Sequence, residues 1–453
     1  MPNLLASLTA AAGTMKAFES AMAVVQNNVT NASTPGYARQ QMDLVALAFQ
    51  PELELSGGVQ ARSMVSSRDD YAERSVRQRA QGWGRLSQLA SGLSQVEPVF
   101  DLADGSGIAG ALSQLSSAFS QLGVTPNDLT ARQNVIGAAQ DVARSFNFTG
   151  QSLAQVSEHT DREIRSVVDS INRIAGDIRD LNAQLRGDYR TQSDAGVNAR
   201  MYASLEELST LVDFNAIHQP DGTVTVLIGG QVPLVIGDKT FAISADFSGA
   251  RTDILDYSGK SVGGTLTEGQ LGGLLELAND KIPSYIADVN RLAAGFADTV
   301  NGILAGGLDL NGQPPIVDLF QYDGQLGAAV TLGVTNITPD QIAAASAGTP
   351  GGNGNALDLA EMDGSKQIDG YTFTEFYGNI AARAGRDLSA AQEDESSQSL
   401  LLTQARTLHD DVSGVNLDQE AASLLEFQRG YEAAAQMIRI LQSLTDEVFN
   451  MLR

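Results

Sequence analysis

The chain has 453 residues, with 29 Lys and Arg against 54 Asp and Glu, and it contains no cysteine. At about 100–200 residues per domain, the length predicts two to four domains. A hydrophobic share of 43% and a charged share of 18% are typical of a folded globular protein. The net charge of −25 repels phosphate groups, so nucleic acid is an unfavourable partner. The missing cysteines exclude disulfides, thiolate nucleophiles and sulfur-based zinc sites.

The sequence predicts no membrane insertion. No stretch approaches 18 consecutive apolar residues, the length that a membrane-spanning helix needs. The N-terminal segment also lacks the basic region and unbroken apolar core of a cleaved secretory signal.

The first thirty residues carry apolar side chains at alternating spacings of four and three. This spacing is typical of the a and d positions of a coiled-coil helix, and it stops at the helix-breaking segment from Asn31 to Pro35. The predicted seam consists of Leu4, Leu8, Ala11, Met15, Phe18, Met22, Val25 and Val29.

The last 37 residues repeat the pattern, with Thr445 as its one polar interruption. Terminal helices fray unless they are docked, so we expect the two seams to pack on each other, on neighbouring copies, or on both. The C-terminal seam consists of Leu417, Ala421, Leu424, Phe427, Tyr431, Ala434, Ile438, Leu441, Val448 and Leu452.

Between the two ends, helical periodicity dominates, with one β-rich interval. Helices are predicted over 74–96, 108–122, 125–146, 152–187, 284–304 and 388–408, and another near Thr374. A β-meander is predicted over 223–227, 232–236 and 240–243, and a strand-like piece over 328–332.

These patterns predict a mainly α fold with a small inserted part that is β-rich or irregular. We expect terminal heptad helices over 1–40 and 414–453, and a helical body over 41–205, 266–304 and 365–413. The inserted outer domain is expected over 206–265 and 305–364.

No catalytic, cofactor-binding or metal site is predicted. The Gly-x-Gly-x-x-Gly spacing at 105–110 follows a helix, whereas a dinucleotide site needs a preceding strand. His159, His218 and His409 share no metal-ligand spacing. A hydrolase using an exposed carboxylate pair has no motif behind it, so we expect the protein not to be an enzyme.

Two motifs at opposite ends of the chain resemble those of the bacterial flagellar rod, hook and hook-associated proteins. The first comprises residues 27–31 and 34–40, and the second comprises residues 413–420 and 426–435. The Thr-Pro-Gly-Tyr-x-Arg-Gln form of the first motif is most similar to the hook-associated members that join hook to filament. The hook protein, which typically has Gly-Phe-Lys at 36–38, and an intracellular coiled-coil scaffold are the alternatives.

The resemblance implies a structural subunit of the flagellum at the hook–filament junction, exported unfolded by type III secretion. It implies an extracellular location after a transient cytoplasmic stage. The implied partners are the hook protein, the second junction protein, other copies in a ring at the hook tip, and a cytoplasmic export chaperone on the C-terminal helix.

The segment from Thr34 to Gln40 is expected to act as a joint at the end of the first helix. Pro35 moves Thr34 out of the helical region, and Gly36 permits a positive φ. Tyr37 is expected to pack on the helical body, and Arg39 to meet a carboxylate of the same or a neighbouring subunit. Asn28 and Asn31, from the first motif, complete the predicted assembly interface.

Overall fold

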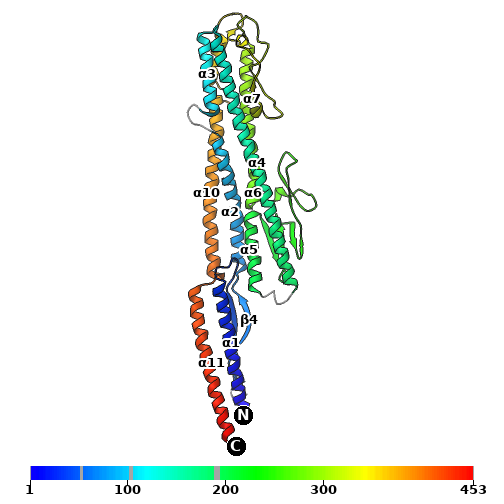
Figure 1. Ribbon diagram of the computed structural model, residues 1–453, viewed down its shortest axis with the longest axis vertical. Helices are drawn as coiled ribbons and strands as arrows, with labels where there is room; N and C mark the ends of the chain where they lie inside the picture. The colour runs from blue at the N-terminus through cyan, green and yellow to red at the C-terminus, as the bar shows by residue number, and fades with distance from the viewer. Residues whose placement is uncertain (1, 51–54, 101–105, 188–193, 452–453) are drawn as a thin grey trace. The chain divides into compact units, whose positions relative to one another are not determined.

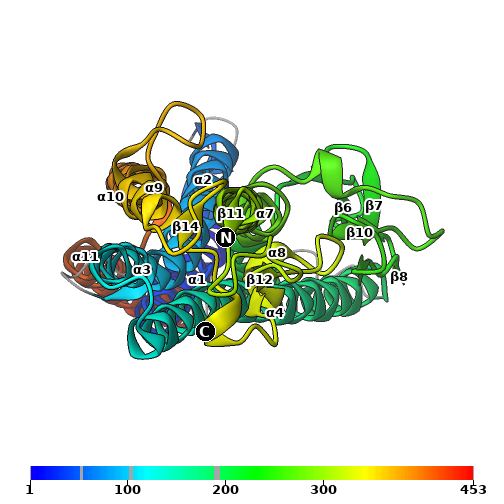
Figure 2. The same cartoon turned by 90° about the horizontal axis from the view of Figure 1, so that it is seen from above.

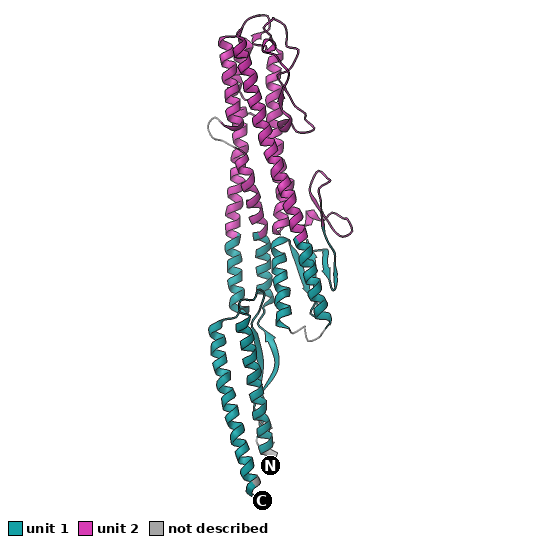
Figure 3. Cartoon of the chain, in the orientation of Figure 1, with its two compact units in different colours: residues 1–83, 170–243, 398–453 teal, residues 84–169, 244–397 magenta. Residues whose placement is uncertain are grey.

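The computed structural model describes residues 2–50, 55–100, 106–187 and 194–451. Its contacts define two compact units, one of residues 1–83, 170–243 and 398–453 and the other of residues 84–169 and 244–397 (Figure 3). Three long helices contribute residues to both units: α2 (Asp70–Val96), α4 (Leu129–Gly187) and α10 (Phe373–Ser413). The prediction of a mainly α fold with a smaller β-rich part is confirmed.

The first unit contains both ends of the chain as paired helices. Helix α1 (Pro2–Thr30) and helix α11 (Leu417–Met451) lie side by side (Figure 1). A hairpin follows α1, in which β1 (Gln40–Ala46) pairs antiparallel with β4 (Val59–Ser66). The shorter strands β2 (Phe49–Gln50) and β3 (Leu55–Ser56) pair beyond them.

The hairpin corrects the expectation that residues after 40 begin a helical body. Its register shifts between Met42 and Leu44, and only Gln40 among the β1 residues is fully buried. A strand with a bulge and little burial lacks the strict alternation by which strands are recognised in a sequence.

The first unit also contains α5 (Ala195–Leu211) and an antiparallel sheet in the order β5-β6-β7-β8. The strands are β5 (Phe214–His218), β6 (Val224–Ile228), β7 (Val232–Ile236) and β8 (Lys239–Thr240). The sheet lies beside α4 (Figure 2), where the Asn182 side chain donates to the carbonyls of Val224 and Gly237. The alternating apolar residues of β6 face the core, as the sequence predicts.

The second unit packs helices around an aromatic core. With segments of α2, α4 and α10, it comprises α3 (Gly107–Val124), α6 (Gly269–Glu276) and α7 (Ile282–Ala305). Phe296 of α7 lies at the centre, with its ring centroid 6.4, 5.5 and 5.4 Å from those of Phe146, Phe320 and Phe373. No helix in the described ranges combines the length and apolar character of a membrane span.

Short elements complete the second unit. Antiparallel pairs are formed by β9 (Ser244–Asp246) with β10 (Asp253–Leu255), β11 (Gly307–Leu308) with β14 (Ala345–Ser346), and β12 (Phe320–Gln321) with β13 (Gly333–Val334). The short helices are α8 (Ala328–Thr331) and α9 (Gly354–Glu361). One-turn 3-10 helices lie at 97–99, 263–265, 339–341 and 362–364.

Two expectations for the middle of the chain differ from these contacts. Residues 328–331 form a helical turn instead of a strand, because Gly327 takes a φ of 102° and its carbonyl accepts from the Thr331 amide. The segments 206–265 and 305–364 do not form one outer domain. Residues 206–243 pack in the first unit with α4 and α5, whereas 244–265 and 305–364 belong to the second.

The helix expected to begin beside Pro283 instead continues from α6. A π-helical segment, Leu277–Lys281, joins α6 to α7 and shifts the hydrogen bonding just ahead of the proline, which has no amide hydrogen to donate.

Glycine lets α6 approach α2 closely, since a Cβ on Gly273 would lie 2.3 Å from the Arg85 carbonyl oxygen.

We expect Gly273→Ala to destabilise the second unit by about 2 kcal/mol or more. The added methyl group would clash with the Arg85 backbone, which cannot change rotamer as a side chain could. Gly137→Ala is the matched control, since Gly137 also lies in a helix and a Cβ on it would point into open space. The control should gain about 0.5–1 kcal/mol. Denaturant unfolding measures both, and equal stabilities for the two variants would contradict the close crossing.

Candidate assembly site

The predicted terminal seams meet each other in the first unit. Phe18 of α1 and Phe427 of α11 have ring centroids 6.3 Å apart, and Gly430 lies against the Phe18 ring. A Cβ on Gly430 would lie 2.8 Å from Phe18 Cζ, so this glycine permits the close packing of the two helices.

Most of the predicted seam is covered in the structure. Ala11, Val25 and Ala434 are buried. Half-buried positions are Leu4, Leu8, Met15, Phe18, Met22, Leu424, Phe427, Tyr431, Ile438, Leu441 and Val448. Leu452 lies outside the described residues.

Three predicted seam positions are exposed. Val29 is 46% exposed, Leu417 is 55% exposed, and Ala421 is exposed as well. At this end of the helix pair the contact between α1 and α11 is polar, because Asn28 of α1 bonds to Glu420 of α11. The apolar seam therefore stops before the spacing of the sequence suggests.

Helix α1 buries a second stripe, of which the sequence analysis identified only Asn28. Ala17, Ala21, Val24 and Asn28 recur at spacings of four and three, and all are buried. The β1–β4 hairpin packs on α1, and the Val59 amide donates to Thr14 Oγ1 at 3.0 Å. Ala17 and Ala21 did not stand out in the sequence, because small residues are weaker signals of burial than leucine or phenylalanine.

Asn28 is the centre of a buried polar cluster at the end of α1. Its Nδ2 donates to the Gln40 carbonyl at 2.8 Å and to Glu420 Oε2 at 3.1 Å. Its Oδ1 accepts from the Gln40 amide and from the Tyr37 hydroxyl, both at 2.9 Å. Both donors and both acceptor positions of the amide are thus used, which a buried Asn requires.

Glu420, in the first turn of α11, completes this cluster. Its side chain is only 1% exposed, and Arg39 Nε lies 2.6 Å from Oε1. The expected carboxylate partner of Arg39 therefore belongs to the same subunit. Burial, followed by the Glu420 charge, raises the pKa of Tyr37, so its hydroxyl remains a donor to Asn28.

The joint itself has the expected backbone. Gly36 has a φ of 72°, and a Cβ there would lie 2.3 Å from the Ala199 carbonyl oxygen of α5. Pro35 is exposed, Tyr37 is buried, and Asn31 Nδ2 donates to the Asn27 carbonyl at the end of α1. Gly36 is therefore required both by its φ and by its contact with α5.

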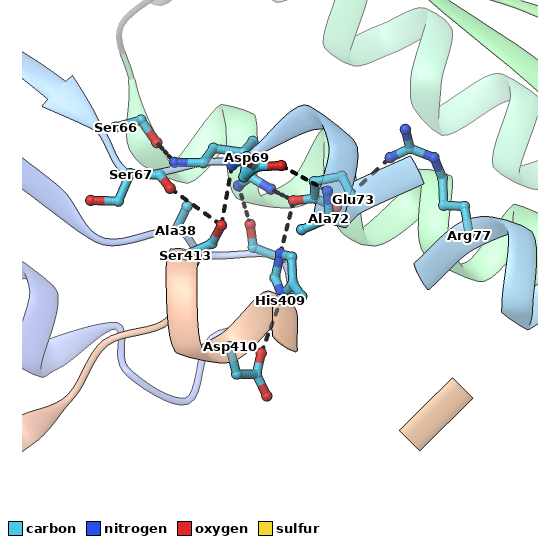
Figure 4. Close-up of polar contacts among 12 residues, drawn as sticks. Ala38, Ser66, Ser67, Asp69, Ala72, Glu73, Arg77, His409, Asp410 and Ser413 are labelled. Carbon is cyan, nitrogen blue, oxygen red and sulfur yellow. Dashed lines mark hydrogen bonds and ion pairs between the residues drawn. The ribbon is translucent and has the colours of Figure 1, made fainter. Parts of the chain in front are cut away.

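Polar contacts also connect the joint to the end of α10, the end of β4 and the start of α2 (Figure 4). The Ser413 hydroxyl donates to the Ser67 carbonyl and accepts from the Asp69 amide, both at 3.2 Å. The Ser413 carbonyl accepts from the Arg39 amide at 2.8 Å. Asp69 Oδ1 accepts from the Ala72 amide, as an N-cap of α2. The sequence analysis gave no role to Ser67, Asp69 and Ala72, which carry no periodic signal.

An open cavity of about 580 Å³ borders the joint, lined by residues 32–37 and by the ends of α10 and α11. Its walls carry charges of both signs, including Arg406 paired with Glu206 at 2.8 Å. Within the described ranges, no cluster of His, Asp and Glu side chains is arranged to hold a metal ion. The arrangement fixes the directions in which the helices leave the joint.

Helix α11 also carries an apolar face that α1 does not cover. Met437 and Ile440 are 57% and 55% exposed, and Leu444 is 44% exposed. With Met451 they recur at spacings of three, four and seven, and we call these four residues the outer seam. The C-terminal seam predicted from the sequence faces α1, and we call it the inner seam. The sequence analysis missed the outer seam because the inner seam alone fits a complete coiled-coil pattern.

Comparison with known proteins gives the same reading of both ends. Residues 8–37 match a family of flagella basal body rod proteins, and residues 411–451 match the C-terminal family of flagellar basal body rod FlgEFG proteins. Residues 93–320, half of the chain, match the helical domain of the flagellar hook-associated protein FlgK. The chain belongs to the FlgK family of flagellar hook-associated proteins.

Curated relatives agree over nearly the full length. The chain is 25% identical to flagellar hook-associated protein 1 of Bacillus subtilis, covering 99% of both chains. It is 23% identical to the protein of that name from Salmonella typhimurium, covering 96% of this chain and 98% of the relative. In fold it is similar to the flagellar hook junction protein FlgK of Burkholderia pseudomallei, with a TM-score of 0.67, 16% identity, and coverage of 76% of this chain and 100% of the other.

We expect Asn28→Ala to loosen both terminal helices together, because it leaves the buried Glu420 carboxylate and the Gln40 backbone short of partners. The cost should be about 2–4 kcal/mol in local opening. Hydrogen exchange on peptides from α1 and α11 measures it, with the exposed neighbour Gln26→Ala as the control. Faster exchange in one helix alone, or in neither, would contradict the conclusion that the buried polar cluster around Asn28 holds both helices.

Proposed function

We propose that the chain is a structural subunit of the bacterial flagellum that acts at the hook–filament junction and assembles through its terminal helices. The observation that carries this proposal is the pairing of α1 with α11, which the buried cluster of Asn28, Arg39 and Glu420 fixes. Membership of the FlgK family supports the place in the flagellum. The role is structural and uses no cofactor.

The exposed apolar side chains favour the C-terminal segment as the surface for other subunits. At least ten large apolar residues between 400 and 451 are exposed in the isolated chain, a concentration that marks interaction surfaces. They are Leu400, Leu401, Leu408, Val412, Leu417, Leu425, Met437, Ile440, Leu444 and Met451.

The outer seam provides the contact for further copies of the chain. Helix α1 is covered on two sides, by α11 and by the hairpin, whereas α11 is covered on one. A second seam on a helix that already pairs lets coiled-coil packing continue from one subunit to the next. Contacts between unlike surfaces form a ring when their rotation closes, as self-association at the hook tip requires. The hook protein and the second junction protein are the proposed neighbours.

The same helix is the proposed site of a cytoplasmic export chaperone, before the subunit reaches its extracellular location. In the folded subunit α1 covers the inner seam, so a chaperone that holds Ile438 must bind before the two helices pair. Ile438→Asp should then abolish binding of the purified export chaperone to the full chain. Unchanged affinity, measured by calorimetry, would contradict this part of the proposal.

We expect Ile440→Asp to prevent stable incorporation at the hook tip, because it places a charge in the outer seam while leaving the inner seam intact. The measurement is an immunoblot of hooks isolated from a strain whose own gene is deleted, together with filament protein released into the medium. Ser443→Asp is the control, since Ser443 is also exposed on α11 and lies outside the seam. Normal incorporation and motility with Ile440→Asp would overturn assembly through this face.

A further inference from the structure

The His409 ring, one helical turn before Ser413, faces carboxylates with both of its nitrogens (Figure 4). Nε2 lies 3.2 Å from Glu73 Oε1 of α2, and Nδ1 lies 3.1 Å from Asp410 Oδ1. An ionised carboxylate only accepts hydrogen bonds, and a neutral imidazole carries a single N–H. Only the protonated ring donates to both neighbours.

The two carboxylates differ in their freedom to respond. The side chain of Glu73 is 10% exposed and pairs with Arg68 and Arg77, whereas that of Asp410 is 74% exposed. Glu73 is therefore held in place and keeps its charge when His409 loses its proton. The contact between α10 and α2 then changes from an ion pair into a single hydrogen bond, which is weaker.

Charged and titratable side chains lie on each element near His409. On α2 and the turn before it, these are Arg68, Asp70, Glu73 and Arg77. On α5 they are Tyr202 and Glu206, and in the joint Arg39. Helix α10 itself carries Arg406, Asp410 and Asp411. The Arg68 guanidinium lies 3.6 Å above the centre of the Tyr202 ring, and Arg406 pairs with Glu206. Glu73 and Asp410 thus remain the two groups in direct contact with the imidazole.

These contacts favour the charged forms of both His409 and Glu73. The hydrogen bond to Glu73 raises the pKa of His409 despite burial, and the Glu73 charge and Asp410 add to the effect. Burial works against ionisation of Glu73, but His409, Arg68 and Arg77 outweigh it and lower the pKa of that carboxyl. By contrast, burial lowers the pKa of His218.

We propose that His409 is a proton-operated latch of the joint: the protonated ring fixes the end of α10 to α2, and the neutral ring loosens the backbone from which α11 departs. The link to the joint is Ser413, which bonds to Ser67, Asp69 and Arg39 one turn later. The latch goes beyond the proposed function, because it operates within one subunit and requires no assembly.

The pH window follows from the raised pKa. A group that binds its proton more tightly in the folded state stabilises that state fully below its unfolded pKa, about 6.5 for histidine. The stabilisation is lost as the pH rises through the folded-state value. The joint should therefore be tightest in mildly acidic solution and should loosen above neutral pH.

Two measurements on the purified full chain test the latch. The protein has three histidines, so an NMR titration of the imidazole signals resolves each of them. His409 should titrate above the value of a free histidine and His218 below it. In hydrogen exchange corrected for intrinsic rates, segments 34–40 and 409–420 should lose about threefold to tenfold protection between about pH 6 and about pH 8.5.

His409→Gln, which keeps a donor but cannot be charged, should remove this pH dependence and show the lower protection throughout. Asp410→Asn, at an exposed position, should reduce the dependence without abolishing it. His159→Gln is the control, since His159 lies in α4 with its side chain 43% exposed and belongs to the other unit. The same pH-dependent loss in His409→Gln as in the native chain, or a His409 titration at or below the free value, would overturn the proposal.

Discussion

The buried carboxylate of Glu420 is the constraint on which the joined ends of the chain depend. With its side chain 1% exposed, it must keep its partners, because an unpaired buried charge costs several kcal/mol. Those partners lie on two other segments: Asn28 on the last turn of α1 and Arg39 on the chain leaving it. Apolar seams alone allow two helices to slide by a heptad, whereas this polar contact selects one register, as buried polar residues do in coiled coils.

The two terminal helices consequently have different tasks. Helix α1 is enclosed, with one stripe on α11 and a second beneath the hairpin, so it serves as an internal support. Helix α11 is enclosed on one side only and keeps a row of exposed apolar residues. The two terminal helices are fixed to each other within the subunit, and one of them exposes an apolar face. This arrangement suits a subunit that binds its neighbours while it keeps its own fold. Family membership places that subunit in the flagellum.

Long-period patterns were predictable from the sequence, whereas contacts between distant segments were not. The seams gave both terminal helices, and the turn chemistry of Pro35 and Gly36 gave the joint. Glu420 lies within a recognised motif, but the sequence analysis assigned it no role. Its role depends on a hydrogen bond to Asn28, which is 392 residues away in the sequence. The hairpin and the outer seam were missed for opposite reasons: the first has too little alternation, and the second is concealed by a pattern that already accounts for the helix.

The most direct measurement is a double-mutant cycle on Arg39 and Glu420, with Arg39→Met and Glu420→Gln made singly and together. Hydrogen exchange of α1 and α11 gives the free energy of opening for each form. If the buried pair fixes the ends, the two substitutions are coupled by about 1.5 kcal/mol or more, as for other desolvated charge pairs. Additive effects, within about 0.5 kcal/mol, would show that the Arg39–Glu420 pair does not fix the ends of the helices.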